Sequence, residues 1–317
     1  MKRGCLIALG VVGGLVAILL LAALIADQKY EFLWASPVNS HSALVAQDTC
    51  VQLVIRPETA LAQIPKLFPN SKVPPTFLGQ VLPYEIALLC SADSGAKSAD
   101  VTVFVNDRRL GPMIRQAANA SMFRGVFPSV TWTSESMQRE KRGKLILTGA
   151  IPIDKATNDA VTGHWSALSS FNKPLEVDAK HLIELALDNR SGGVFALMAS
   201  LPKAGSPESA SFRDENTIKL FAGVSVARLT ADLAEGNTAT VDVDIQTNPQ
   251  ANMIFALKLL LDGAIPQLNE SLKRSYGASI DGKSTTEDNT IKGHYTITNV
   301  DRILSAASGA GGKVTRE

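Results

Sequence analysis

Thr240-Val241-Asp242-Val243-Asp244-Ile245 is the stretch that best indicates the fold, because apolar and polar side chains alternate along it. Alternation with a period of two is typical of a β-strand that has one face on a core. A similar stretch, Asp100-Val101-Thr102-Val103-Phe104-Val105, lies 140 positions earlier in the chain. We therefore expect the same kind of strand at two equivalent places in the fold.

Two further matches extend this repeat. Residues 51–57 correspond to residues 194–200, which lie 143 positions later. Ile151 and Asp154 correspond to Ile297 and Asp301, with offsets of 146 and 147. Each match is weak by itself, but the near-constant offset predicts an internal duplication.

The hydrophobic pattern predicts the order strand, connection, hairpin, helix, hairpin and short helix in each half. We expect a long second helix that Pro266 kinks or splits, because proline removes one helical hydrogen bond. The connection between the halves is expected to be helical at 180–187. Expected strands lie at 49–55, 84–90, 99–106, 129–135, 144–151, 194–200, 218–229, 238–247, 278–282 and 290–298, and the main helices at 108–123 and 249–276.

This order predicts an α+β fold, in which antiparallel sheets carry helices on one face. The two sheets could pack together or be continuous. The predicted organisation is a transmembrane signal anchor at 1–26, a juxtamembrane linker at 27–47, a first α+β unit at 48–165, a connecting helix and linker at 166–190, a second unit at 191–304 and a flexible tail at 305–317.

The first residues predict a membrane anchor. Lys2 and Arg3 precede an uncharged run from residue 4 to residue 26, long enough to cross a hydrocarbon core of about 30 Å. A cleaved secretory signal is the alternative, but its apolar stretch is shorter and needs a small residue before the cut. Basic residues near a span stay in the cytoplasm, so the remainder is expected to be periplasmic or extracellular. Apolar positions of this span include Leu6, Val12, Leu19 and Ile25.

Residues beside and within this span suggest lipid and protein contacts. Tyr30, Phe32 and Trp34 could lie at headgroup depth, or they could form a short strand of the domain. Gly10 and Gly14 have the spacing of a close helix pair and could support self-association. The partners expected are membrane lipid and a protein or membrane complex. With 31 basic and 30 acidic residues, the chain has no excess of positive charge for nucleic acid.

Cys50 and Cys90 are the cysteines of the exported part, and both lie in strand-like runs. Export to an oxidising compartment favours a disulfide between them if the two strands are neighbours. Two buried thiols are the alternative.

No catalytic, cofactor-binding or metal-binding motif is found in the sequence. His41, His164, His181 and His294 lack the spacing of a metal site. Asp242 and Asp244 share one strand face about 7 Å apart, which suits acid–base chemistry but also an ordinary solvated face.

We therefore predict a membrane-anchored, noncatalytic interaction or structural module outside the cytoplasm, such as a scaffold or an accessory subunit of a membrane complex. A binding module for a lipid or another apolar cell-envelope ligand is the alternative. An exported hydrolase that uses His164, His294, Asp242 and Asp244 is the third hypothesis.

Overall fold

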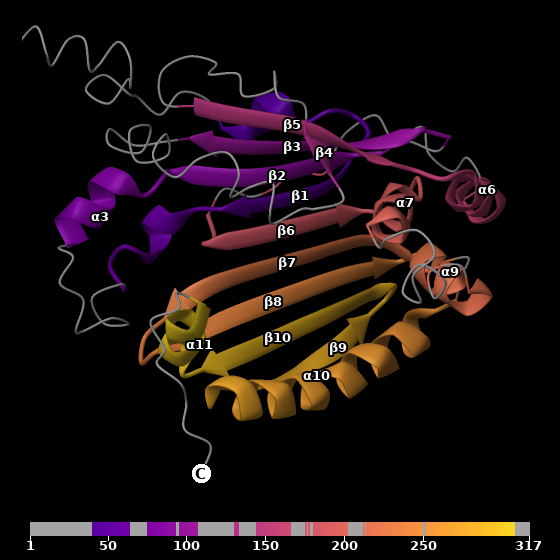
Figure 1. Ribbon diagram of the computed structural model, residues 1–317. Coiled ribbons are helices and arrows are strands. Elements are labelled where there is room, and N and C mark those ends of the chain that lie inside the picture. Colours follow the sequence, from indigo (N-terminus) through magenta and orange to yellow (C-terminus); the bar gives the residue numbers. More distant parts are fainter. Residues whose placement is uncertain are drawn as a thin grey trace, which may run out of the picture.

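A large antiparallel sheet with helices packed on it forms the fold, which is α+β as expected (Figure 1). The computed structural model describes residues 40–63, 75–92, 95–106, 130–132, 144–165, 180–201, 214–249 and 252–307, together with residues 175, 177 and 212. Within these ranges the sheet has ten strands in the order β4-β5-β3-β2-β1-β6-β7-β8-β10-β9.

The strands of the first half are β1 to β5, and those of the second half are β6 to β10. The first set is β1 Thr49–Ile55, β2 Glu85–Ser91, β3 Ser98–Asn106, β4 Thr131–Trp132 and β5 Lys144–Pro152. The second set is β6 Ile183–Asp188, β7 Val224–Ala234, β8 Thr238–Thr247, β9 Ser279–Glu287 and β10 Thr290–Thr298. Every described pairing between neighbours is antiparallel.

The sheet is continuous through its centre, where β1 pairs with β6 and Leu53 lies opposite Leu185. Counted outward from this pair, one half runs β1, β2, β3, β5, β4 and the other runs β6, β7, β8, β10, β9. The strand order is therefore the same in both directions. Of the two arrangements considered, packed sheets or one sheet, the chain adopts the single sheet.

The helices cover parts of the sheet and one end of it. They are α3 Pro75–Val81, α6 Lys155–His164, α7 Gly193–Ser200, α9 Glu215–Ala222, α10 Ile254–Tyr276 and α11 Val300–Ala307, with 3-10 helices η1 His41–Leu44 and η2 Pro57–Ala60. The largest buried cluster lies under α6, α7 and α9, where Phe195 stacks on Trp165 and meets the edge of Phe221. A smaller cluster on β1 to β5 is covered by Leu44 of η1 and Val177.

Residues 180–187 do not form the helix that we expected from the sequence. Residues 183–188 are β6, which pairs with β1 on one side and β7 on the other. Ile183, Leu185 and Leu187 alternate with polar or small residues, so the period of two was present. The expected connecting segment at 166–190 therefore contributes a central strand of the sheet.

Residues 194–200 do not form the expected strand but lie in α7. A short run of apolar residues is compatible with either structure, and here tertiary contacts decide. Asn189 stabilises the start of this helix, because its Oδ1 accepts the Phe195 amide while its Nδ2 donates to the Phe221 carbonyl. The predicted match between residues 51–57 and 194–200 is thus wrong, because the strand equivalent to β1 in the sheet order is β6.

Other boundaries agree more closely. β1 and β8 span the residues expected, while the first part of the strand expected at 218–229 is the helix α9. α10 is one continuous helix with Pro266 inside it, so the proline does not split it. The last expected hairpin is present, but β9 extends to Glu287.

Several predictions fall outside the described residues. These are the anchor at 1–26 with Leu6, Val12, Leu19 and Ile25, the glycines Gly10 and Gly14, the ring residues Tyr30, Phe32 and Trp34, the helix at 108–123 and most of the tail at 305–317. Of the expected linker at 27–47, the described part contains η1, which is packed on the sheet. Among the described residues, no helix has the length and apolar character that crossing a membrane requires.

Candidate interaction surface

Each of the four histidines lies beside one carboxylate. The nitrogen–oxygen distances are 3.0 Å for His41 and Glu85, 3.5 Å for His164 and Glu215, 2.5 Å for His181 and Asp232, and 2.6 Å for His294 and Asp242. Each pair joins different elements, and no carboxylate is shared between two of these pairs. The described residues contain no group of three potential metal ligands.

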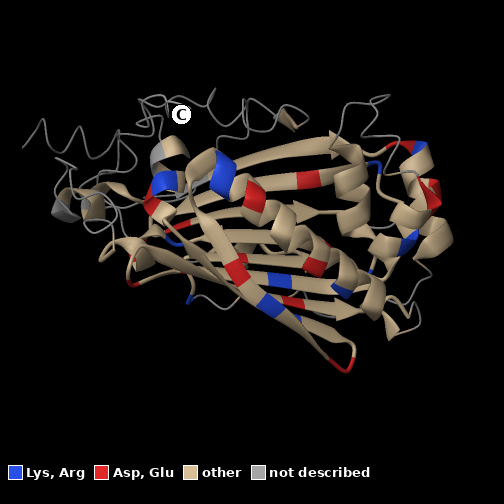
Figure 2. Cartoon of the chain, turned by 90° about the horizontal axis from the view of Figure 1, so that it is seen from below, with Lys and Arg blue, Asp and Glu red and all other residues tan. Residues whose placement is uncertain are grey.

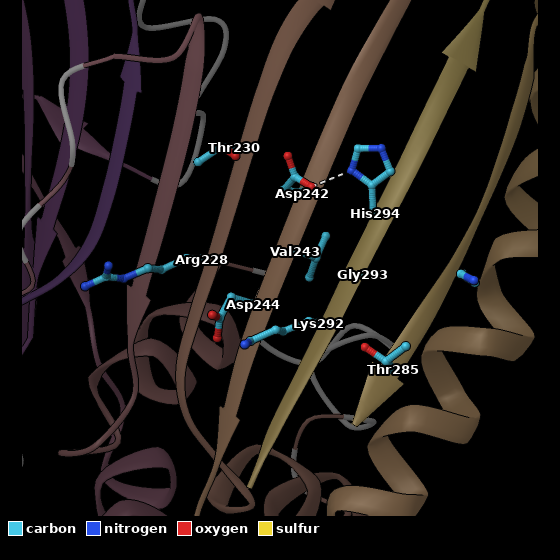
Figure 3. Close-up of a pocket in the computed structure, with 10 residues that line it drawn as sticks. Arg228, Thr230, Asp242, Val243, Asp244, Thr285, Lys292, Gly293 and His294 are labelled. Carbon is cyan, nitrogen blue, oxygen red and sulfur yellow. Dashed lines mark hydrogen bonds and ion pairs between the residues drawn. The ribbon is translucent and has the colours of Figure 1, made fainter. Parts of the chain in front are cut away.

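Asp242 and Asp244 share one face of β8, as the alternation predicted, and this face carries an open pocket of about 410 Å³ (Figure 3). Among the histidines, one lines this pocket, His294 on β10. Its ring and Asp242 are both mainly exposed, with 66 % and 57 % of their side-chain surfaces accessible. Across the strands Asp244 lies opposite Arg228 and Lys292. Alternating charges of this kind form a solvated, cross-strand paired surface.

A buried polar cluster lies at the ends of β1, β2 and β6. Arg56 contacts Glu184 at 3.1 Å and Glu85 at 3.6 Å, and all three side chains are nearly inaccessible. His41 adds two hydrogen bonds to Glu85, one from its backbone amide at 2.7 Å and one through Nδ1 at 3.0 Å. Burial alone would raise the pKa of Glu85, but these bonds and the charge of Arg56 outweigh it and lower the pKa. The cluster fixes η1 to the sheet.

The disulfide expected between Cys50 and Cys90 is absent from the structure. The two residues lie on adjacent strands, which was the condition for a disulfide, but both are free, buried thiols. Cys50 lies where the β1–β2 register shifts, and its Sγ donates to the Cys90 carbonyl at 3.4 Å. Burial raises the pKa of each thiol to about 12. The side chains therefore act as small apolar core residues.

The outer face of α10 is the largest apolar feature that remains exposed on a described helix. Phe255, Leu259 and Leu260 have accessible fractions of 76 %, 74 % and 54 %. They recur at helical spacing together with Ala256 and Gly263, which are also exposed. The opposite side of the helix is held on the sheet through Leu257, which is buried. Figure 2 shows α10 lying in front of the sheet.

A groove of about 440 Å³ runs between α10 and β9. Ser284 donates to Asp262 at 2.6 Å across it, and Lys258 forms an ion pair with the same carboxylate. Asn269 accepts the backbone amide of Ile280 at 3.1 Å. These contacts attach α10 along the margin of the sheet and place its apolar outer face beside β9.

Tyr295 forms the floor of this groove. Its ring packs against Gly282 and Gly293, where a Cβ atom would come within 2.7 Å and 2.6 Å of ring carbons. Burial, and to a smaller extent the charge of Asp262, raise the pKa of its hydroxyl group. The glycines therefore allow the aromatic ring to lie flat on the strands.

Sequence reasoning predicted α10 but not that its apolar side would be exposed. The signal was available, because residues 254–265 contain two charged residues, Lys258 and Asp262. These two side chains pair with each other on one side of the helix. The other side chains around this part of the helix are apolar, apart from Gly263. A helix that is apolar all round is normally covered on all sides.

Comparison with known proteins gives little further information. No family model and no curated protein matches the sequence. A solved structure described as crystal form I of TP0453 is similar, with 10% sequence identity and a TM-score of 0.35 over 87% of this chain and 98% of that chain. A TM-score this low does not establish a shared fold.

Proposed function

We propose that this chain is a membrane-anchored, noncatalytic interaction module outside the cytoplasm, which binds a protein partner through the outer face of α10. The observation that carries this proposal is the exposure of Phe255, Leu259 and Leu260 on one helix. Burying each such side chain contributes about 1.5–3 kcal/mol. A partner that covers the face would therefore gain binding energy from a few central residues.

The sequence supports the location of this module. An uncharged run from residue 4 to residue 26 follows Lys2 and Arg3, which favours a retained anchor with the domain outside the cytoplasm. The common strand order of the two halves is what an internal duplication would produce. In this reading the second half contributes the docking helix.

Charge favours a protein partner over the bilayer surface for this helix. Helices that lie in a membrane interface usually carry many lysines and arginines on their polar face. In the first three turns of α10 the basic residue is Lys258, and it is paired with Asp262. Beyond Pro266 the outer face becomes polar, with Gln267, Glu270 and Arg274. A short apolar patch beside a polar one is typical of a protein interface with a core and a rim.

A second candidate function is binding of an apolar ligand. The face of the sheet on which α10 lies carries a row of half-buried apolar side chains, Leu185, Leu229 and Val243, at paired positions of β6, β7 and β8. An acyl chain could cover them. Binding of a fluorescent fatty acid that Leu229→Asp abolishes and Leu259→Glu leaves unchanged would favour this candidate.

Purification of the full chain from membranes in a mild detergent tests the main proposal. We expect a stoichiometric complex by native mass spectrometry, which Leu259→Glu disrupts because it places a charge in the apolar face. Gln267→Glu is the matched control, because it adds the same charge on the polar part of the same helix. A monomer for the unmodified chain, or a complex that both variants leave intact, would contradict the proposal.

A further inference from the structure

Among the described residues β9 is the terminal strand of the sheet, so within that part of the chain one of its edges has no neighbouring strand. The backbone amides of an antiparallel strand point alternately to the two sides. The Ile280 amide donates to Asn269 on α10, away from β10. Because the pairing with β10 is regular from Ser279 to Glu287, the amides of Gly282, Ser284 and Thr286 also point to this outer edge.

The outer edge of β9 is closed at one end and open at the other. Side chains occupy the first two outward amides, Asn269 at Ile280 and Asp281 at Gly282. For the backbone of Ser284 and Thr286 the described residues provide no hydrogen bond on this side. Figure 2 shows the acidic turn between β9 and β10 projecting from the sheet beside this edge. An edge of this kind is a template for a further strand.

We propose that the strand that pairs here is β9 of a second copy of this chain, so that the two sheets join about a twofold axis through Thr285. This inference rests on the proposed function and names the protein partner. In this register Ser284 lies opposite the partner subunit's Thr286, and Thr286 lies opposite the partner subunit's Ser284. Both outward amides of each strand then gain a carbonyl partner.

The charges on β9 select this register. An axis through Thr285 places Lys283 opposite the partner's Glu287 twice, on the face shared by odd-numbered residues. An axis one residue earlier would place Asp281 opposite the partner's Glu287, and an axis two residues earlier would pair Lys283 with the partner's Lys283. Opposite charges across strands stabilise a pair and like charges destabilise it. Glu287 already contacts Lys292 at 2.5 Å, and a carboxylate can accept a second donor.

The apolar face of α10 lies at the level of the same axis. Asn269 meets Ile280 and Asp262 meets Ser284, so Leu259 lies beyond Ser284 toward Thr286. The twofold axis therefore gives the two α10 helices antiparallel directions on the same face of the joined sheet. The patch on α10 alone is smaller than the roughly 800 Å² per partner of a stable interface, and strand pairing adds to it.

Oxidative crosslinking of the full chain in detergent tests this geometry. Thr285→Cys is expected to give a disulfide-linked dimer, because directly opposite residues at a non-hydrogen-bonded position lie close together. Gln246→Cys is the matched control, because it is exposed on the same face of the sheet but on β8. We expect at least tenfold less dimer from this control.

A charge exchange gives a second test that does not depend on crosslinking. Lys283→Glu should weaken the dimer in sedimentation experiments, and adding Glu287→Lys should restore it. A homodimer that forms no Thr285→Cys crosslink, and that the charge variants do not change, would overturn this interface.

The outcomes separate the two proposals. A complex with a different protein that Leu259→Glu disrupts would leave the proposed function intact and overturn the second copy as the partner. A monomer under all conditions would overturn both.

Discussion

At the scale of single residues, the difference between buried and exposed ion pairs decides which histidine matters for stability. His41 and Glu85 have almost no accessible side-chain surface, whereas His294 and Asp242 are mainly exposed. Removing one partner of a buried pair leaves the other charge without compensation, whereas an exposed pair contributes little. The same two residue types therefore have different roles at the two places.

Glu85→Gln is expected to lower the free energy of unfolding by about 3 kcal/mol near neutral pH, because Arg56 and His41 lose a buried carboxylate. The pKa of Glu85 is lowered in the fold, so its ionised form adds stability above the pKa of an unfolded glutamate, about 4.3. This stability is lost as pH falls through the lower pKa of the folded state.

Urea unfolding between pH 7 and pH 3 measures this effect. The difference between wild type and Glu85→Gln should shrink at the acidic end. Asp242→Asn, which removes the carboxylate of the exposed pair, should change stability little at any pH. A difference for Glu85→Gln that does not vary with pH would contradict the assignment.

At the scale of secondary structure, two positions depend on glycine, Gly282 in β9 and Gly236 in the turn between β7 and β8. Gly282 has a φ of 152°, and a Cβ atom there would lie 2.2 Å from the His294 carbonyl oxygen. Gly236 also has a positive φ, 71°, but a Cβ atom there would have no neighbour within 4 Å. Gly282 is therefore required because a Cβ atom does not fit there, whereas Gly236 is required only for its backbone conformation.

Gly282→Ala is expected to destabilise the fold by about 3 kcal/mol, because β9 would have to move away from β10. Gly236→Ala should cost only the strain of a left-handed residue, about 1 kcal/mol. Thermal unfolding of both variants checks the order. Equal losses would show that the close approach of β9 and β10 is not as the structure has it.

The strands and helices also show which elements the sequence pattern could predict. β8 was predicted from its alternation of apolar and polar residues, and β1 from a strand-like apolar run. The segments that became β6 and α7 were assigned the wrong way round. The apolar run at 194–200 is compatible with a buried strand or a buried helix, whereas residues 183–188 did carry the period of two of a strand.

The candidate site was only partly predictable for a related reason. The sequence predicted α10, but an almost wholly apolar helix does not reveal which side contacts the sheet. The polar residues from Lys283 to Thr286 concealed the second part of β9, because an edge strand can be solvated along much of its length. The open edge of β9 and the exposed face of α10 are recognised only when the position of the helix relative to the strand is known.

At the scale of the whole molecule, the sequence predicts an anchor that would keep the chain at the membrane. We expect the full chain to remain in the membrane fraction after an alkaline carbonate wash, because residues 4–26 can span the hydrocarbon core. Replacing two central positions, Val12 and Leu19, by aspartate should release the protein or prevent its insertion, whereas Val12→Leu with Leu19→Val should not. A chain that the wash releases without any substitution would contradict retention of the anchor.

The attachment of His41 to Glu85 has a mechanical consequence, since it fixes the point at which the chain leaves the sheet. Between the end of the predicted span at Ala26 and Ser40 lie 13 residues, 27–39. A fully extended segment of this length spans only about 45 Å. With the predicted anchor retained, the attachment point of the folded domain at Ser40 would stay within about 45 Å of the lipid.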